Sequence, residues 1–166
     1  MEEFKVGLKK VAVFCYIFNK DGSKALMLKR NKEPHVGRYI PVGGKLEPFE
    51  DPYDCVRREI FEETGIVPEK VKLMGITTDT SPTKFNWVNY VFTAQANGME
   101  TKVCPEGGLE WVNKDKLIEI TTNKAYEFAV EQIFSGKFFC INILNDADIN
   151  LLELKDNISG KVLFKK

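Results

Sequence analysis

The chain has 166 residues, of which 43% are hydrophobic, and this length and composition predict one core and a single domain over residues 1–166. Its 24 Lys and Arg residues balance 24 Asp and Glu residues and are spread along the chain, which argues against binding to long nucleic acids or to a membrane surface. The longest apolar run, residues 11–18, is too short to cross a bilayer, and the four cysteines are widely separated. We therefore expect a cytoplasmic protein with free thiols, and the sequence indicates no oligomeric state.

The first part of the chain alternates strand-like runs with turn signals. Residues 11–18 are rich in β-branched and aromatic side chains, and an Asp-Gly pair predicts a hairpin turn before a second strand at residues 25–28. A third strand at residues 39–42 leads into a pair of glycines, residues 43–44. We expect these strands to lie in one sheet.

A short helix with clear boundaries is predicted next. Asp51 is a favourable N-cap, Pro52 suits the first helical position, and the carboxylate of Asp54 in the first turn favours the positive end of the helix dipole. Gly65 stands where a left-handed C-terminal cap is expected.

The remainder of the chain is expected to contain strands and one further helix. The predicted elements are strands at residues 71–78, 87–94 and 108–112, a helix at residues 123–135, and a terminal hairpin formed by residues 138–144 and 151–154. Strands mixed with two main helices predict an α/β fold, in which helices cover both faces of a mixed β-sheet.

One stretch carries charged residues and glycines at a fixed spacing. It runs Gly44-x5-Glu50-x7-Arg58-Glu59-Ile60-x-Glu62-Glu63-x-Gly65-Ile66, where x is any residue. On a helix, Glu59, Glu62 and Glu63 project from one face with Cβ atoms roughly 5 to 6 Å apart, so their charges repel. The C-terminal half of a helix disfavours anions further. A divalent cation resolves this conflict, and hard oxygen ligands suit Mg²⁺ or Mn²⁺.

Arg58 has two candidate partners within this stretch. It can form a solvated ion pair with Glu62 one turn further on, or it can reach Glu50 and hold that carboxylate in place. Both contacts are compatible with the spacing.

This spacing, with the run G-R-Y-I-P-V-G-G-K-L-E before the helix and E-G-G-L-E-W-V after it, resembles Nudix hydrolases of the MutT-like branch. The resemblance covers most of the chain and implies a Nudix-type α/β/α sandwich with a mixed β-sheet. It further implies that Glu59, Glu62 and Glu63 bind Mg²⁺, with Mn²⁺ as the alternative ion. The backbone carbonyl of Gly43 completes this ligand set, and Glu50 supports it.

The resemblance also implies that residues outside the helix bind the metal or the phosphates. Glu106 matches a family acidic residue that serves as metal ligand or base, with an ordinary turn position as the alternative and Glu110 as its nearest competitor. Lys45 matches the family lysine that contacts phosphate oxygens, with a solvated lysine as the alternative. Arg38 and Arg30 are further candidates for phosphate binding, or plain surface charges.

The implied reaction is metal-assisted hydrolysis, in which Glu59 or Glu106 takes the proton of the attacking water and Arg58 acts in the same site. Asn123 matches a family residue that reads the purine edge, and it suits a helix N-cap equally well. The candidates for stacking against a base, or for filling the core, are the aromatic residues of one strand, Phe85, Trp87, Tyr90 and Phe92.

The resemblance implies a pyrophosphohydrolase of small nucleotides, with oxidised purine nucleoside triphosphates such as 8-oxo-dGTP as substrates and a monophosphate and pyrophosphate as products. Cleavage of ADP-ribose or of dinucleoside polyphosphates is the alternative, since Pro82 resembles a marker of the ADP-ribose branch. A Nudix-fold module that binds a nucleotide without cleaving it is a third hypothesis.

Overall fold

The computed structural model describes residues 7–32, 36–121 and 124–166. Its strands are β1 (Leu8–Phe18), β2 (Lys24–Arg30), β3 (Tyr39–Lys45), β4 (Glu69–Thr80), β5 (Phe85–Gln95), β6 (Gly107–Asn113), β7 (Phe139–Asn145), β8 (Leu151–Asp156) and β9 (Val162–Lys165). Its helices are α1 (Pro52–Thr64), α2 (Leu117–Ile120) and α3 (Lys124–Phe134), and a 3₁₀ turn, η1 (Lys114–Lys116), precedes α2. Within these ranges no helix is both long and apolar enough to span a membrane.

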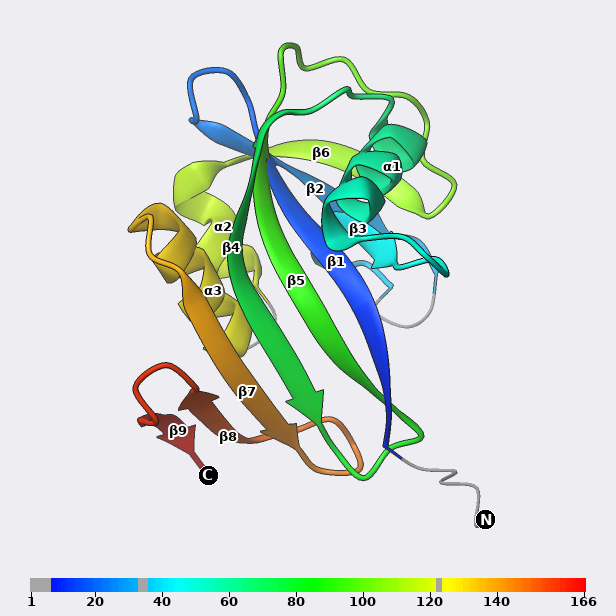
Figure 1. Cartoon of the computed structure of the whole chain (residues 1–166). Coiled ribbons are helices and arrows are strands. Elements are labelled where there is room, and N and C mark those ends of the chain that lie inside the picture. Colours follow the sequence, from blue (N-terminus) through cyan, green and yellow to red (C-terminus); the bar gives the residue numbers. More distant parts are fainter. Residues whose placement is uncertain (1–6, 33–35, 122–123) are drawn as a thin grey trace.

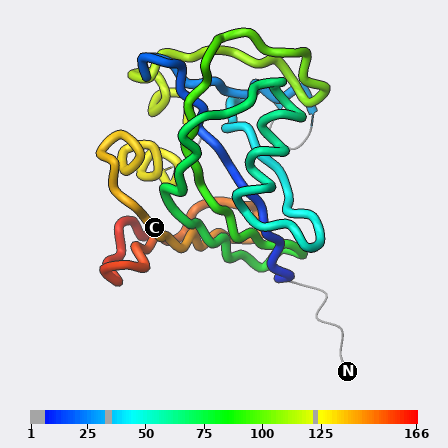
Figure 2. Tube along the Cα trace, turned by 45° about the horizontal axis from the view of Figure 1, so that its top comes forward, coloured from blue at the N-terminus to red at the C-terminus, as the bar shows by residue number. Residues whose placement is uncertain are grey.

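The strands form one mixed sheet, in the order β6-β2-β3-β1-β5-β4-β7-β8-β9. β1 runs parallel to β5, and β4 runs parallel to β7, whereas the other neighbours are antiparallel. Figure 1 shows α1 on one side of the sheet and α2 and α3 on the other, and Figure 2 shows the same separation from a second direction. The predicted α/β/α arrangement around a mixed sheet is therefore confirmed.

Each face of the sheet has its own apolar core because successive side chains of a strand point to opposite faces. On one face, Ile17 of β1 belongs to an apolar cluster with Val56 and Ile60 of α1. On the other face, Tyr16 belongs to a cluster with Val130 of α3. The two faces are called the α1 face and the α3 face below.

The predicted boundaries of α1 are confirmed. The side chain of Asp51 accepts hydrogen bonds from the backbone N–H groups of Tyr53 (2.7 Å) and Asp54 (3.1 Å), as an N-cap does. Gly65 closes the helix with a φ of 77°, in the left-handed region, and its N–H donates to the carbonyl of Phe61. Local sequence signals thus set both ends of the helix that carries the glutamates.

The aromatic residues of β5 do not share one face. Phe92 is fully buried in the cluster under α1, and Tyr90 packs against the same cluster, so the hypothesis that these two rings form a stacking surface is wrong. Trp87 is half-buried on the α3 face, where Lys10 pairs with it in register. Because successive side chains of a strand point to opposite faces, Trp87 lies on one face of the sheet and Phe92 on the other.

Several smaller elements were not predicted, namely η1, α2 and the edge strand β9. Each is four residues or fewer, too short to produce a recognisable hydrophobic period. The second predicted helix is present as α3. Asn123, at its expected start, lies outside the described residues.

Candidate active site

Two glutamates of α1 lie against the glycine pair at the end of β3. The backbone N–H of Gly43 donates to Oε2 of Glu63 over 3.2 Å. A Cβ at Gly44 would lie 2.2 Å from Oε1 of Glu59, so a side chain at this position and the observed Glu59 carboxylate exclude each other. The glycine pair therefore lets both carboxylates approach the backbone of β3.

Arg58 joins three carboxylates, those of Glu50, Glu59 and Glu62. Its Nε and Nη2 donate to the two oxygens of Glu50 over 2.8 and 2.9 Å, and its Nη1 donates to Glu59 (2.8 Å) and Glu62 (3.1 Å). Both contacts anticipated for Arg58 are thus present together. The bidentate pair lowers the pKa of Glu50 to about 2, which keeps this carboxylate ionised. Nη2 also donates to the carbonyl of Lys45, which ties the end of β3 to α1.

The two carboxylates that lie against the glycine pair, Glu59 and Glu63, have raised pKa values. Burial raises the pKa of Glu63 to about 7, and the charges of Glu106 and Glu59 add to that effect, whereas the N–H of Gly43 opposes it. Burial also raises the pKa of Glu59, against the opposing contact with Arg58. Glu63 is buried and Glu59 partly buried, and carboxylates with raised pKa values gain free energy from a neighbouring cation.

Glu106 and Glu110, the two competitors for the additional acidic position, have different surroundings. Glu106 forms an ion pair with Arg30 over 3.1 Å and is close enough to Glu63 to raise its pKa. Glu110 instead accepts a hydrogen bond of 2.5 Å from the hydroxyl of Tyr39. The fold therefore brings Glu106 to the glutamates of α1.

The residues predicted to contact phosphate lie before and after the glycine pair. Lys45 is exposed at the end of β3, with its Nζ 5.8 Å from the centre of the Trp87 ring. Arg38 is exposed just before β3. Arg30 faces Glu106 and Glu63 from the end of β2.

The chemistry of these side chains fits a hard divalent cation. In the described part of the chain, no group of three or more His, Cys, Asp or Glu side chains is arranged as a ready-made metal site. The guanidinium of Arg58 instead occupies the position among Glu50, Glu59 and Glu62. The donor set nevertheless consists of carboxylate oxygens, which suit Mg²⁺, and burial of Glu63 favours a compensating positive charge.

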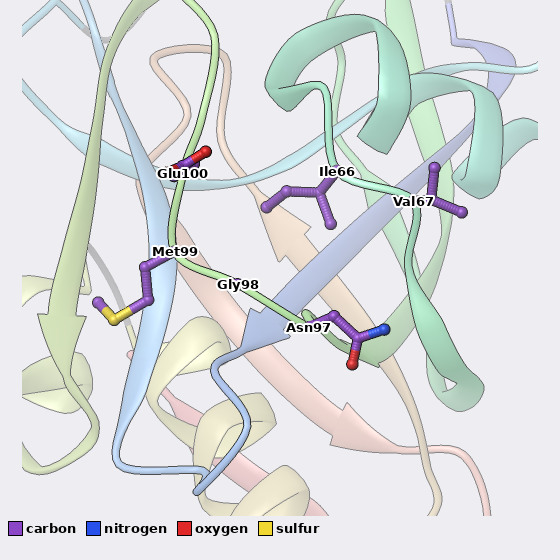
Figure 3. Close-up of a pocket in the computed structure, with 6 residues that line it drawn as sticks. All are labelled: Ile66, Val67, Asn97, Gly98, Met99 and Glu100. Atoms are coloured by element: carbon purple, nitrogen blue, oxygen red, sulfur yellow. The ribbon is translucent and has the colours of Figure 1, made fainter.

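A cavity of about 450 Å³ lies elsewhere, at the end of α1. Figure 3 shows Ile66 and Val67 on one side of it and Met99 and Glu100 on the other. None of the glutamates discussed above lines this cavity. It is therefore distinct from the candidate active site.

Sequence reasoning did not identify the pairs Arg30–Glu106 and Tyr39–Glu110. Their members lie 76 and 71 residues apart in the chain. β2 pairs with β6 in a register that places Arg30 opposite Gly107, and this pairing of distant strands creates the contacts. The sequence showed Glu106 immediately before β6 and Glu110 within it, but not which residues they contact.

Comparison with known proteins assigns this chain to a family. Residues 8–132 match the family described as NUDIX domain. An ADP-ribose pyrophosphatase of Methanocaldococcus jannaschii is 31% identical over 104 residues, which cover 61% of this chain and 60% of the relative. The 8-oxo-dGDP phosphatase NUDT18 of Mus musculus is 27% identical over 111 residues, which cover 64% of this chain and 32% of that protein. The alignments thus span 60% or less of these curated relatives.

Among solved structures, the MutT protein from Bacillus halodurans superposes with a TM-score of 0.78 at 26% identity, over 90% of this chain and 98% of that one. A MutT protein from Methanosarcina mazei Go1 superposes with a TM-score of 0.66, also at 26% identity, over 78% of this chain and 96% of the other. The family match covers more than half of the chain and agrees with the glutamate arrangement on α1. The chain belongs to the Nudix family and is MutT-like in its fold.

Proposed function

We propose that the protein is a Mg²⁺-dependent pyrophosphohydrolase that cleaves purine nucleoside triphosphates such as 8-oxo-dGTP into a monophosphate and pyrophosphate. The observation that carries this proposal is the pair of carboxylates, buried Glu63 and partly buried Glu59, held against the glycine pair of β3. Hydrolysis of a phosphoric anhydride requires neutralisation of charge on the phosphates, and this donor set suits the ion that does so.

In this proposal Glu59, Glu62, Glu63 and Glu106, with the carbonyl of Gly43, hold the metal. Mn²⁺ is the alternative ion. The bound ion would supply electrostatic stabilisation of the phosphoryl oxygens and acidify a water molecule.

The remaining tasks fall to the chain's own side chains. Glu59 or Glu106 accepts the proton of the attacking water. Arg58 positions Glu59 while Glu50 holds its guanidinium from the other side, through contacts of 2.8 Å each. Lys45, exposed beside the glycine pair, is placed to contact a phosphate oxygen, and Arg38 is a second candidate.

Two relatives support different substrates for the same chemistry. By its name, NUDT18 acts on an oxidised guanine nucleotide, whereas the Methanocaldococcus jannaschii protein acts on ADP-ribose. The resemblance of the sequence motifs to the MutT-like branch favours the nucleoside triphosphate, and ADP-ribose is the second candidate. We further propose that residues 1–166 form a single Nudix domain and act in the cytoplasm, where the four free cysteines stay reduced.

The proposal is tested by measuring Mg²⁺-dependent product release from 8-oxo-dGTP, dGTP, ADP-ribose and diadenosine tetraphosphate. We expect kcat/KM to be highest for 8-oxo-dGTP, with pyrophosphate as the second product. Glu59→Gln should lower kcat at least about 100-fold, whereas Glu119→Gln, an exposed matched change in α2, should leave it unaltered.

A higher kcat/KM for ADP-ribose than for 8-oxo-dGTP would agree with the proposed metal chemistry and would identify ADP-ribose as the preferred substrate. Tight nucleotide binding without any hydrolysis would instead indicate a binding module and contradict the proposal.

A further inference from the structure

The α3 face of the sheet is only partly covered by α3. The helix shares an apolar cluster with Tyr16, near the end of β1, and with Val91 of β5. Towards the start of β5, the same face carries the half-buried Trp87, with Lys10 opposite it on β1 and the exposed Lys45 on β3. Figure 1 shows β1, β4 and β5 continuing beyond α3 in this direction.

This uncovered region adjoins the candidate phosphate site. The ammonium groups of Lys45 and Lys10 lie 5.8 and 5.9 Å from the centre of the Trp87 ring. Lys45 follows the glycine pair against which Glu59 and Glu63 lie. Lys45 therefore adjoins both the glycine pair and the ring, so a nucleotide whose phosphates contact Lys45 can bring its base over Trp87.

A polar network lies beside Trp87 on the same face. Asn89 is 3% exposed, and its amide donates to the hydroxyl of Thr77 over 3.0 Å. The side chain of Asn89 also lowers the pKa of Asp79, so its amide lies close to that carboxylate. Asp79 and Trp87 adjoin the paired residues Thr78 and Val88, so they are neighbours across β4 and β5.

The carboxylate of Asp79 is poorly solvated. Burial raises its pKa to about 6, against the opposing effects of Asn89 and Lys9. Burial and the charge of Asp79 raise the pKa of Tyr126 in α3 to about 12, so the first turn of α3 lies close to this carboxylate. At neutral pH this partly buried carboxylate is thus an ionised acceptor beside the ring of Trp87. Such a carboxylate has lone pairs beyond the one that Asn89 engages.

We propose that Asp79 is a specificity-determining residue that reads the base of the substrate, and that it selects guanine-type bases over adenine. This inference rests on the proposed function, whose substrate class it narrows. A carboxylate only accepts hydrogen bonds, and guanine and 8-oxoguanine present two adjacent donors, N1–H and the 2-amino group. Adenine presents the acceptor N1 beside its amino group, which a carboxylate repels. Asn89 and Thr77 hold the carboxylate in position, and Trp87 offers a ring for stacking.

The test measures equilibrium binding of GMP, IMP and AMP by calorimetric titration, without hydrolysis. We expect the wild-type protein to bind GMP about 10-fold more tightly than AMP, with IMP, which lacks the 2-amino group, in between. Asp79→Asn replaces the acceptor pair by one donor and one acceptor, which match adenine. It should bring the GMP to AMP ratio to 1 or below.

Two control variants separate base reading from other effects. Asp148→Asn makes the same chemical change at an exposed loop position and should leave the GMP preference unchanged. Trp87→Leu removes the ring and should weaken GMP and AMP by similar factors of about 5-fold or more.

Equal wild-type affinity for GMP and AMP, or an unchanged preference in a folded Asp79→Asn protein, would overturn the inference. If that variant does not fold, the wild-type comparison of GMP with IMP decides, and equal affinities would reject the role of Asp79. A GMP preference without Mg²⁺-dependent hydrolysis would reject the proposed function while supporting the inference. Mg²⁺-dependent hydrolysis without a preference between GMP and AMP would support the proposed function and reject the inference.

Discussion

At the scale of single residues, the contact between Gly44 and Glu59 ties backbone geometry to the proposed chemistry. Gly44→Ala places a Cβ 2.2 Å from the carboxylate of Glu59, so Glu59 must move. Because misplacement of a catalytic group by about 1 Å can cost roughly 100-fold in rate, we expect kcat to fall by about 10-fold to 100-fold. The measurement is steady-state hydrolysis of the best substrate at saturating Mg²⁺.

Gly108→Ala is the matched control for this change. Gly108 lies on β6, and a Cβ there meets no atom within 4 Å. This variant should retain kcat within about 2-fold by the same assay. A Gly44→Ala enzyme that remains as active as the control would show that Glu59 is not held where the reaction needs it.

Asp79 also predicts a pH dependence of stability. Its folded pKa, raised by burial to about 6, exceeds the ordinary value of 3.8, so its contribution is fully present below about pH 4 and is lost as pH rises through 6. Lys9, Asn89 and Tyr126 are the groups that face it. Between pH 4 and 7 the free energy of unfolding of Asp79→Asn should therefore decline less than that of the wild type, by about 2 kcal/mol. The measurement is urea unfolding of both proteins at these pH values. The same change in the free energy of unfolding with pH in both proteins would disprove this contribution.

At the scale of the element, α1 depends on its N-cap. Asp51→Ala removes an acceptor for the N–H groups of Tyr53 and Asp54 and should destabilise the protein by about 1 kcal/mol. For a chain of this length that corresponds to a decrease in Tm of about 2 to 4 °C. Asp51→Asn keeps an acceptor oxygen and should lose less than half as much. The measurement is thermal unfolding by circular dichroism, and equal losses in both variants would assign the effect to charge rather than capping.

Strand pairing, unlike helix capping, was not predictable at this scale. The strands were expected close to where they lie, but the register of β2 with β6 joins residues more than 70 positions apart. Periodicity within a strand shows which residues alternate and does not show which other strand lies beside it. The approach of Glu106 to Glu63 depends on that register.

At the scale of the whole molecule, metal binding should be visible as stability. A ligand that binds only the folded state at 100 times its dissociation constant stabilises it by about 2.7 kcal/mol, or roughly 5 to 10 °C in Tm for this chain. We expect Mg²⁺ to raise the Tm of the wild type in this way. In Glu63→Gln the increase should disappear, although the amide oxygen can still accept from Gly43.

Without metal, Glu63→Gln should be at least as stable as the wild type, because the substitution removes a buried carboxylate whose pKa is raised. Glu119→Gln should keep the full response to Mg²⁺, since its side chain is exposed and pairs with Lys116. A Mg²⁺ response that survives in Glu63→Gln would remove Glu63 from the ligand set.

The sequence alone determined the helix α1, its two caps, the shared face of its glutamates and the presence of a mixed sheet. These features depend on residues within a few turns of one another, where capping chemistry and side-chain period act directly. Only the tertiary structure decided that Arg58 holds Glu50, Glu59 and Glu62 together, that Glu106 rather than Glu110 approaches Glu63, and that Trp87 is separated from Phe92 by the sheet. These depend on strand register and burial, which join distant parts of the chain and are set by the packing of the whole molecule.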